Sequence, residues 1–419
     1  MQIRQIDTES RIGGPFTPEE LHSYAHAAVH RCLDLAEGDL LLIDYEPEHR
    51  PLVVALHEAA YRAGLRVSAA LCDPLLLQAE LQFASDDAIG RLEAWQRERL
   101  LARTGEGAAQ IVIRGEEMPG VLDSCDPQRA ALRTRRTSEL SAELYARMQT
   151  YHDAFLILAY PTQAWASRVY PAQPREVAQR RLAEDMLDFC RIGPGDAPDA
   201  LDRHVATLRH RAETTSRLRL PELRFRGPGT DLRVGLAPDH VWRTAEMTNA
   251  YGRTFLRNLP SEEIFTAPLA SATEGRVRCT KPLAARGFVC EDVELEFRSG
   301  RLVRACAATD AQRDTLLAQL DPDPAARRLG EVALVDGGSR VGRRNRIFWN
   351  TLLDENQDCH VAIGVGLADC RAAGVASPDL SCASTHVDLI VGGPDVDVVG
   401  RTATGAEVPL IVDGVWRLE

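Results

Sequence analysis

Helical and strand patterns alternate along the first half of the chain. A capping-box start at Thr17, followed by Pro18 and Glu20, predicts a helix that continues to about Leu35. Continuous apolar runs then predict strands at Leu40–Asp44, Val67–Leu71, Ala109–Ile113 and Ala154–Ala159. Helical periodicity surrounds His57, Trp95, Leu140 and Glu184. Because the strands are apolar throughout and alternate with helices, this half is predicted to be an α/β domain with a mainly parallel sheet.

The pattern changes near Arg217. From Glu222 onward, shorter strands alternate apolar and polar residues and are separated by tight glycine turns, for example at Gly227–Thr230 and Arg298–Gly300. The second half is therefore predicted to be an α+β domain with mainly antiparallel strands. A chain of 419 residues exceeds the usual size of one core, so we expect two domains, at residues 1–217 and 218–419.

Composition and charge exclude several classes of function. Apolar residues make up 45% and charged residues 26% of the chain, as in ordinary globular proteins. The formal charge of -12 argues against nucleic-acid binding, which needs clustered positive charge. No secretory signal pattern or apolar run of about 18 residues is present, so we expect a cytoplasmic protein with no membrane segment. The ten cysteines show no CxxC pair and are expected to be reduced and mostly buried.

Two histidine patterns in the first half resemble metal sites but have simpler explanations. His22, His26 and His30 are spaced by four residues, and each step of four overshoots an α-helical turn by about 40°. The series should wind around the helix, so we expect an ordinary, partly exposed helix surface. His57 and Glu58 begin an HExxH pattern that lacks its second histidine, which indicates a crossover helix. Lys281 is the only lysine, and its rarity alone assigns it no chemistry.

The second half contains ionisable residues inside predicted strands. His386 and Asp388 stand two apart, so both side chains should point to one face while their neighbours face the core. An imidazole and a carboxylate on a rigid strand can begin a metal site, although a solvated strand edge is the simpler explanation. Glu331 interrupts an apolar strand, where burial requires either a metal or a salt bridge to an arginine.

Further candidate ligands lie upstream and between these strands. His360 follows an acidic turn and starts an apolar run, where a satisfied core histidine is the alternative to a ligand. Glu262 and Glu263 enter a strand from a loop bounded by prolines. Adjacent side chains on a strand point in opposite directions, so at most one of the two should be a ligand. The other is expected to be solvated or bonded to backbone.

Several long segments of this sequence resemble the M29 family of thermophilic metallo-aminopeptidases. The strongest matches are NLPSEEIFTAP, TKPLAARGFV, ARRLGEVALVDGGS, FWNTLLDENQDCHVAIG and STHVDLIVGGPDVDVVGR, and the resemblance extends along essentially the whole chain. It implies an enzyme that removes residues from the free N-termini of short peptides. It also implies a homodimer with an enclosed cavity that excludes long or folded substrates.

The resemblance implies a site for two divalent metal ions, which in the family are zinc, cobalt, magnesium or manganese. The ligands of the family correspond here to Glu263, Glu331, His360, His386 and Asp388. Two such ions hold a water between them, lower its pKa and polarise the scissile carbonyl. Glu331, or a neighbouring carboxylate, is then the candidate general base.

One position departs from the family pattern. The family usually has a tyrosine seven residues after the ligand that corresponds to His360, where it donates a hydrogen bond to the tetrahedral intermediate. This chain has Leu367, which has no donor, and loss of one such donor typically slows turnover about 10²- to 10³-fold. Asp369, Cys370 and Arg371 are nearby polar candidates for a replacement.

The leucine at this position keeps a second interpretation open. A non-peptidase metalloenzyme on the same fold would act on a small molecule, either as a hydrolase or as an iron-dependent ring-cleaving oxygenase. A metal-stabilised binding protein without catalysis is a third interpretation. The aminopeptidase is the leading prediction, because all five family ligands are present.

Overall fold

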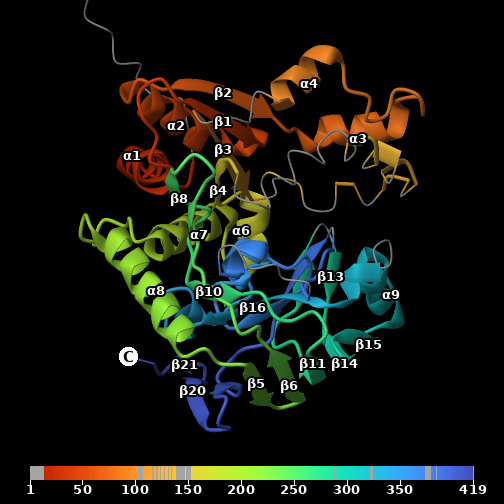
Figure 1. The fold of residues 1–419 in the computed structure, drawn as a ribbon. Helices are drawn as coiled ribbons and strands as arrows, with labels where there is room; N and C mark the ends of the chain where they lie inside the picture. Colours follow the sequence, from red (N-terminus) through yellow and green to blue (C-terminus); the bar gives the residue numbers. More distant parts are fainter. Residues whose placement is uncertain are drawn as a thin grey trace, which may run out of the picture. The chain divides into compact units, whose positions relative to one another are not determined.

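The structure of the chain is a computed structural model, and its elements are shown in Figure 1. It describes residues 14–418 with these exceptions: 102–106, 116–117, 119–120, 123, 127, 131, 134, 138–146, 148–151, 286–287, 321–323, 373–378 and 384. The helix predicted around Leu140 lies outside the described residues.

The chain forms two compact units. Unit 1 comprises Met1–Pro198 and Glu246–Leu259, and unit 2 comprises Asp199–Ala245 and Pro260–Glu419. Where the sequence predicts a domain boundary between residues 217 and 218, the units divide at Pro198 instead, and a later segment returns to unit 1.

Unit 1 contains a five-stranded sheet in which every strand runs parallel to its neighbours, and we call it the unit-1 sheet. Its order is β2 (Arg66–Leu71), β1 (Leu40–Tyr45), β3 (Ala108–Arg114), β4 (Ala154–Ala159) and β9 (Asn258–Leu259). The parallel sheet predicted for this half is thereby confirmed. Asp44 in β1 accepts a hydrogen bond from the side-chain amide of Gln110 in β3, at 2.9 Å.

Unit 1 also contains helices, and Figure 1 shows α1 and α2 lying next to the first strands of its sheet. The helices are α1 (Pro18–His26), the π-helix η1 (Ala27–Cys32), η2 (Pro47–His49), α2 (Arg50–Arg62), α3 (Pro74–Phe83), α4 (Ala94–Leu101), α6 (Gln163–Val169) and α7 (Arg175–Cys190). A short hairpin of β7 (Glu246–Thr248) and β8 (Thr254–Leu256) completes the unit. The capping box at Thr17 is present as predicted, but the helix that follows becomes π-helical after His26.

Unit 2 contains two larger sheets, both antiparallel. The eight-stranded sheet has the order β15 (Arg301–Cys306), β14 (Glu294–Arg298), β11 (Thr273–Arg278), β6 (Thr230–Gly235), β5 (Glu222–Gly227), β19 (Asp397–Arg401), β20 (Glu407–Val412) and β21 (Val415–Trp416). The four-stranded sheet, which we call the site sheet, has the order β10 (Glu263–Thr266), β16 (Leu329–Val335), β17 (His360–Gly364) and β18 (His386–Ile390). The mainly antiparallel fold predicted for this half, with both predicted hairpin turns, is confirmed.

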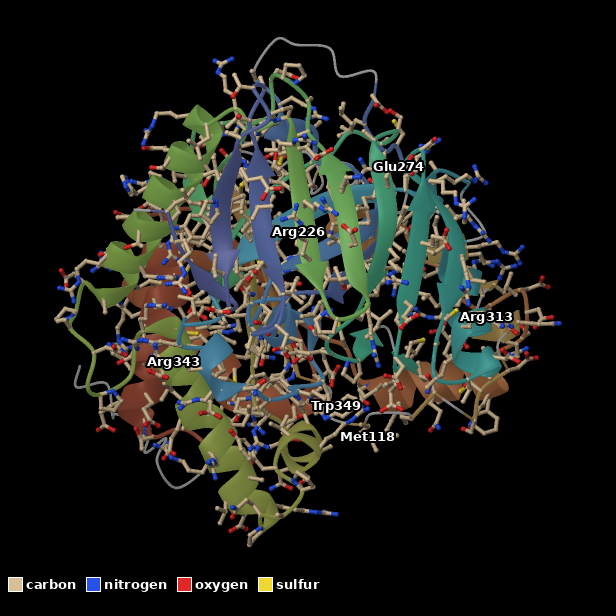
Figure 2. The ribbon with its side chains drawn as sticks, turned by 90° about the horizontal axis from the view of Figure 1, so that it is seen from below. Met118, Arg226, Glu274, Arg313, Arg343 and Trp349 are labelled. Atoms are coloured by element: carbon tan, nitrogen blue, oxygen red, sulfur yellow. The ribbon has the colours of Figure 1, made fainter. Side chains whose placement is uncertain are left out.

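One hydrophobic core joins the inner faces of these two sheets, with members such as Phe225 and Phe297 from one and Val361 from the other. The outer face of the eight-stranded sheet is polar and carries paired charges, such as Arg226 with Glu407 at 2.7 Å. Figure 2, which looks onto this sheet, shows Arg226 on β5 and Glu274 on β11.

Smaller elements complete unit 2 around the sheets. They are the hairpin of β12 (Leu283–Ala285) and β13 (Phe288–Cys290), and the helices α8 (Ala200–Arg217), α9 (Asp310–Leu320), η3 (Pro324–Arg327), η4 (Gly342–Arg344), α10 (Thr351–Asp354) and η5 (Ala368–Cys370). All ten cysteines are free thiols, and seven of them are buried, in agreement with the sequence-based expectation. Among the described residues, no helix is long and apolar enough to cross a membrane.

Candidate metal centre

The site sheet carries all the candidate ligands on one face. Strand pairing places Glu331 beside Ala362, and Ala362 beside Asp388, so these side chains form one row. His360 and His386 lie two residues from this row along their own strands, and therefore point to the same side. The face thus collects Glu263, Glu331, His360, His386 and Asp388. The alternate residues Val332, Leu334, Val361, Val387 and Leu389 lie in the hydrophobic core.

A β-bulge in β16 gives Glu331 this orientation. Leu329 pairs with Ile363 and Glu331 pairs with Ala362, so Gly330 is an extra residue without its own partner position. As a result, Leu329 faces the core while Glu331, two residues later, faces the opposite side. A Cβ at Gly330 would lie 2.0 Å from the carbonyl oxygen of Val365, so a larger residue does not fit there.

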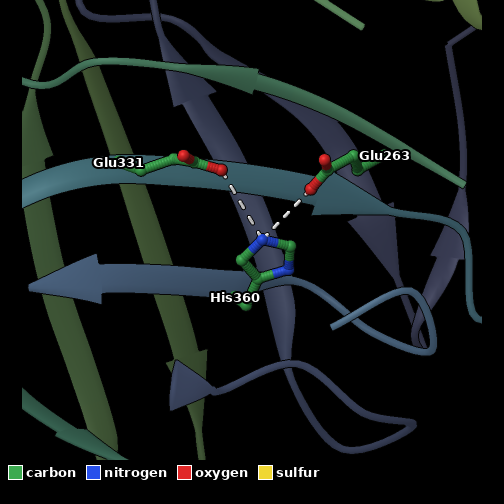
Figure 3. Close-up of side chains that lie close together, drawn as sticks. All are labelled: Glu263, Glu331 and His360. Atoms are coloured by element: carbon green, nitrogen blue, oxygen red, sulfur yellow. Dashed lines mark ion pairs between the residues drawn. The ribbon is translucent and has the colours of Figure 1, made fainter. Parts of the chain in front are cut away.

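The five side chains form a continuous series of short contacts. Nε2 of His360 lies 3.2 Å from Glu263 Oε2 and 3.7 Å from Glu331 Oε1. Figure 3 shows both carboxylates pointing at this nitrogen. The other oxygen of Glu331, Oε2, lies 3.6 Å from Nε2 of His386, which in turn is 3.0 Å from Asp388 Oδ1. Glu331 therefore connects two groups of ligand atoms, one through each carboxylate oxygen.

Burial differs between the two ends of this series. The side chains of Glu263, Glu331 and His360 are between 1% and 3% exposed, whereas His386 is 24% exposed. Burial alone would lower the pKa of His360, but the adjacent carboxylates of Glu263 and Glu331 outweigh it and raise this pKa well above its usual value. The site is thus an enclosed, strongly negative cluster that opens at β18.

The donor set fits divalent metal ions. Glu263, Glu331 and His360 each offer a ligand atom, and these atoms all lie within 4.8 Å of one another. Carboxylate oxygens and imidazole nitrogens are the donors that zinc, cobalt and manganese accept. Three clustered carboxylates leave a negative charge that one or two cations would compensate. No arginine forms an ion pair with Glu331 among the described residues, so the salt-bridge explanation of this residue is wrong.

The neighbour of Glu263 is also buried, which corrects one expectation. Glu262 is 3% exposed, and its Oε2 lies 3.3 Å from Nε2 of His204 on α8. Its backbone N–H donates to the side-chain oxygen of Asn356 at 2.6 Å. Glu262 precedes β10, so strand alternation does not apply to it and it need not face solvent. In the sequence, only the adjacent position of Glu262 and Glu263 drew attention to Glu262, and nothing there indicated its contact with His204.

The segment before His360 is held by an internal polar network that the sequence did not indicate. The carboxylate of Asp354 accepts hydrogen bonds from the backbone of Phe348 at 2.7 Å and from the side chain of Gln357 at 3.0 Å. Lys281, the only lysine, donates to Gln357 at 2.9 Å and to Asp358 at 2.8 Å. These contacts fix the backbone from which His360 projects.

Leu367 belongs to a small apolar cluster next to the candidate ligands. It is 4% exposed and packs with Phe265 and Ala333, which lie on the same face of the site sheet as Glu263 and Glu331. Ala267 and Cys370 are the other two buried members of this cluster. The guanidinium of Arg371 donates to the carbonyl oxygens of Ala267 and Pro268, at 3.1 and 3.4 Å.

The incomplete HExxH pattern is part of helix α2, as predicted. Nδ1 of His57 hydrogen-bonds to the carbonyl oxygen of Val53, and Glu58 pairs with Arg62 at 3.1 Å. Both contacts join residues four positions apart on one helix. This pair therefore has an ordinary helical explanation.

Comparison with known proteins agrees with this site. A family model for the thermophilic metalloproteases (M29) matches residues 17–416. Aminopeptidase T from Thermus aquaticus is 31% identical over 404 residues, covering 95% of this chain and 98% of that protein. The structure of wild-type AmpT from Thermus thermophilus has a TM-score of 0.88 and 30% identity, covering 96% of this chain and 99% of that one.

A more distant likeness concerns the oxygenase interpretation. The 2,5-dihydroxypyridine dioxygenase from Pseudomonas putida KT2440 has a TM-score of 0.54 and 12% identity, over 97% of this chain and 99% of that one. At this identity the likeness shows the fold alone, so the oxygenase alternative is not favoured. Because the family match spans nearly the whole chain and the similar relatives align along their full length, this protein is an enzyme of the M29 family of thermophilic metalloproteases.

Proposed function

We propose that this enzyme is an aminopeptidase that removes residues from the N-termini of short peptides with the help of two divalent metal ions. Membership of a metalloprotease family implies divalent metals. One observation carries the proposal of a pair. The two oxygens of Glu331 face two different imidazoles, with Oε1 at 3.7 Å from His360 and Oε2 at 3.6 Å from His386. A carboxylate in this position can bridge two cations.

Each group of ligand atoms would then hold one ion. Glu263, His360 and Oε1 of Glu331 form the buried group, and His386, Asp388 and Oε2 of Glu331 form the more exposed one. Such ions supply Lewis acidity, which lowers the pKa of a water and polarises a carbonyl. Zinc, cobalt, magnesium and manganese are the candidate metals, because the donors are imidazole nitrogen and carboxylate oxygen.

The exposure of the ligand set indicates where a substrate enters. His386 is the most exposed candidate ligand, and the other four are 13% exposed or less. We therefore propose that a peptide approaches over β18 and that Glu263 and His360 lie behind the reacting groups. A neighbouring carboxylate is the better candidate general base than Glu331, because the two cations would occupy both oxygens of Glu331; Asp388, which offers one oxygen to the exposed group and lies nearer to solvent, is such a carboxylate.

Leu367 sets an expectation for the rate. Its side chain packs with Phe265 and Ala333 and donates no hydrogen bond to a developing oxyanion. Relative to an enzyme with a donor at this position, we expect turnover to be about 10²- to 10³-fold slower. The apolar cluster beside the ligands favours substrates with an apolar group near the scissile bond.

Hydrolysis of aminoacyl anilides and dipeptides by the metal-loaded protein tests the proposal. We expect release of the N-terminal residue, loss of activity after chelation and recovery with zinc or cobalt. An N-acetylated dipeptide is the matched control, because it has no free N-terminus and should not be cleaved. If the metal-loaded protein cleaves none of the free substrates, the proposal is wrong.

The state of assembly and the compartment are also proposals. We propose a cytoplasmic homodimer, as the family resemblance implies. Light scattering during gel filtration would give the mass of the metal-loaded protein, and a mass of one chain would contradict the dimer. Fractionation of the producing cells would test the compartment.

A further inference from the structure

Three histidines on the first helix lie outside the proposed active site. His22 and His26 are on α1, and His30 is on the π-helix η1 that continues it. The ring centroids of His22 and His26 are 6.4 Å apart, and those of His26 and His30 are 4.6 Å apart. All three reach the surface of unit 1. Imidazoles this close on one helix face offer two donors to a single cation.

The π-helix explains why the second pair is closer than the first. Backbone hydrogen bonds in a π-helix run from residue i to i+5, so each turn contains more residues than an α-helical turn. A step of four residues therefore falls slightly short of a full turn, whereas in an α-helix it overshoots one. The step from His26 to His30 runs from the last residue of α1 into the π-helical segment Ala27–Cys32, and this step has the short ring distance. The winding expected from the sequence assumed an α-helix throughout.

The state of these imidazoles also suits metal binding. Among the described residues, none forms a side-chain hydrogen bond or ion pair with His22, His26 or His30, and the ring contacts of these histidines are with one another. Their ring nitrogens are therefore not engaged by other described side chains, and the neutral form of an imidazole is the one that ligates metals.

We propose that His26 and His30 bind one divalent transition-metal ion of the zinc, copper, nickel or cobalt class on the surface of unit 1. Two histidines four residues apart on one helix face are an established arrangement for holding such an ion. Water completes the coordination, and His22 flanks the ion. With two protein ligands in place of the larger set on the site sheet, this ion binds more weakly than those proposed for the site.

The proposal has a direct consequence for metal analysis. A chain that holds two ions on the site sheet would take up a third through His26 and His30. Total metal per chain would then overstate the content of the active site. Variants of these histidines separate the two contributions.

The test counts metal in the full-length protein. Protein saturated with zinc, with the exposed thiols of Cys72 and Cys382 alkylated, is titrated with Cu²⁺ and freed of excess ion by gel filtration. Total zinc plus copper is then measured, because this sum is unchanged if copper replaces zinc elsewhere. Electron paramagnetic resonance of the bound copper reports its nitrogen ligands.

We expect the wild-type protein to hold one more ion per chain than H26Q, H30Q or the double variant, with nitrogen hyperfine structure in the copper spectrum that these variants lose. H210Q, which removes a single exposed histidine on α8, is the control and should keep the ion. Retention in H22Q supports the pair, and loss in all three single variants supports the site with His22 as a third ligand. Equal metal content in wild type and double variant, or loss in H22Q but not in H30Q, would overturn the proposal. Circular dichroism verifies that each variant is folded.

Discussion

The unit-1 sheet and the site sheet are both deeply buried, but they use burial differently. The interior strand β1 of the unit-1 sheet has its buried positions at Leu41, Leu42 and Ile43, all apolar. Every residue of β16 in the site sheet is also buried, yet Glu331 lies among them. Deep burial therefore does not imply an apolar environment.

The two sheets also differ in how they satisfy their carboxylates. Asp44 in the unit-1 sheet accepts a hydrogen bond from the neutral side-chain amide of Gln110. Glu331 in the site sheet meets two imidazoles and lies near other carboxylates. A single carboxylate that accepts a hydrogen bond from a neutral side chain can be structural, whereas a cluster of buried carboxylates favours the binding of metal cations.

The largest expected effect is the loss of activity and metal when the charge of Glu331 is removed from the site sheet. We expect Glu331→Gln to lower kcat/KM for an aminoacyl anilide by about 10²- to 10⁴-fold, because the candidate ligand shared by both proposed ions is weakened and both ions lose their position relative to the substrate. Its metal content should fall as well. Asp44→Asn is the matched change in the unit-1 sheet and should leave metal content at the wild-type value. Equal metal content in both variants would remove the distinction between the sheets.

The two faces of the site sheet should respond differently when metal is absent. Leu334→Ala, on the core face, should lower the free energy of unfolding by about 2–5 kcal/mol, because it opens a cavity. Glu331→Gln should change the stability of the metal-free protein much less, because the repulsion among carboxylates that it relieves offsets the attraction to His360 that it removes. Urea denaturation in the presence of a chelator measures both. Destabilisation of similar size by both changes would argue that Glu331 is a structural residue.

A buried histidine should make the unit-1 sheet sensitive to acid. His49 hydrogen-bonds the carbonyl oxygen of Gly115 at 2.7 Å and accepts from the backbone of Glu46 at 3.1 Å, which ties together the ends of β1 and β3. Burial lowers the pKa of His49 to about 4. Its contribution is complete above the unfolded pKa of about 6.5 and is lost as pH falls toward 4, because only the unfolded state then takes up a proton.

The variant His49→Gln measures the pH-dependent contribution of His49 to the free energy of unfolding. It keeps a donor for Gly115 but loses the acceptor for Glu46, so we expect a loss of about 1–3 kcal/mol in the free energy of unfolding at pH 7.5. The difference from wild type should shrink by about 2 kcal/mol at pH 5. Denaturation curves at the two pH values measure it. A difference that stays constant would show that His49 is not the acid-sensitive group.

The smallest effect is expected from a change in the contact between Glu262 and His204. Glu262→Gln weakens the pairing with His204 and loosens the backbone that presents Glu263. We expect metal affinity to fall about 10- to 100-fold, as for other residues that orient a ligand. Glu407→Gln removes an exposed carboxylate on β20 and is the control. Competition with a chromophoric chelator measures both affinities, and equal values would limit the site to the five candidate ligands.

Much of the fold could be predicted because the decisive patterns are local. Apolar runs placed β1 and β4 to within a residue, and alternation correctly placed His386 and Asp388 on one face. The association of Glu331 with His360 rested on family resemblance, because these residues come from separate strands. Strand pairing is a property of the folded chain, and spacing alone does not define it.

The remaining differences arise from irregular backbone. The π-helix after His26 and the bulge at Gly330 each add a residue to a regular period, and no residue type marks either one uniquely. Burial of Glu262 depends on His204, a residue 58 positions earlier in the chain. Long-range contacts of this kind have no signature in the local sequence.

The bulge at Gly330 acts as a phase shift in the alternation of β16. Without it, Leu329 and Glu331 would point to the same side, as any two residues spaced by two do. Gly330 is therefore the one residue of this strand whose deletion should keep Leu329 in the core and Glu331 among the candidate ligands. Deletion of Val332 would instead exchange the two faces for part of the strand. Tolerance of β16 to changes in length should thus depend on where the change falls, and a scan of single deletions would reveal that asymmetry.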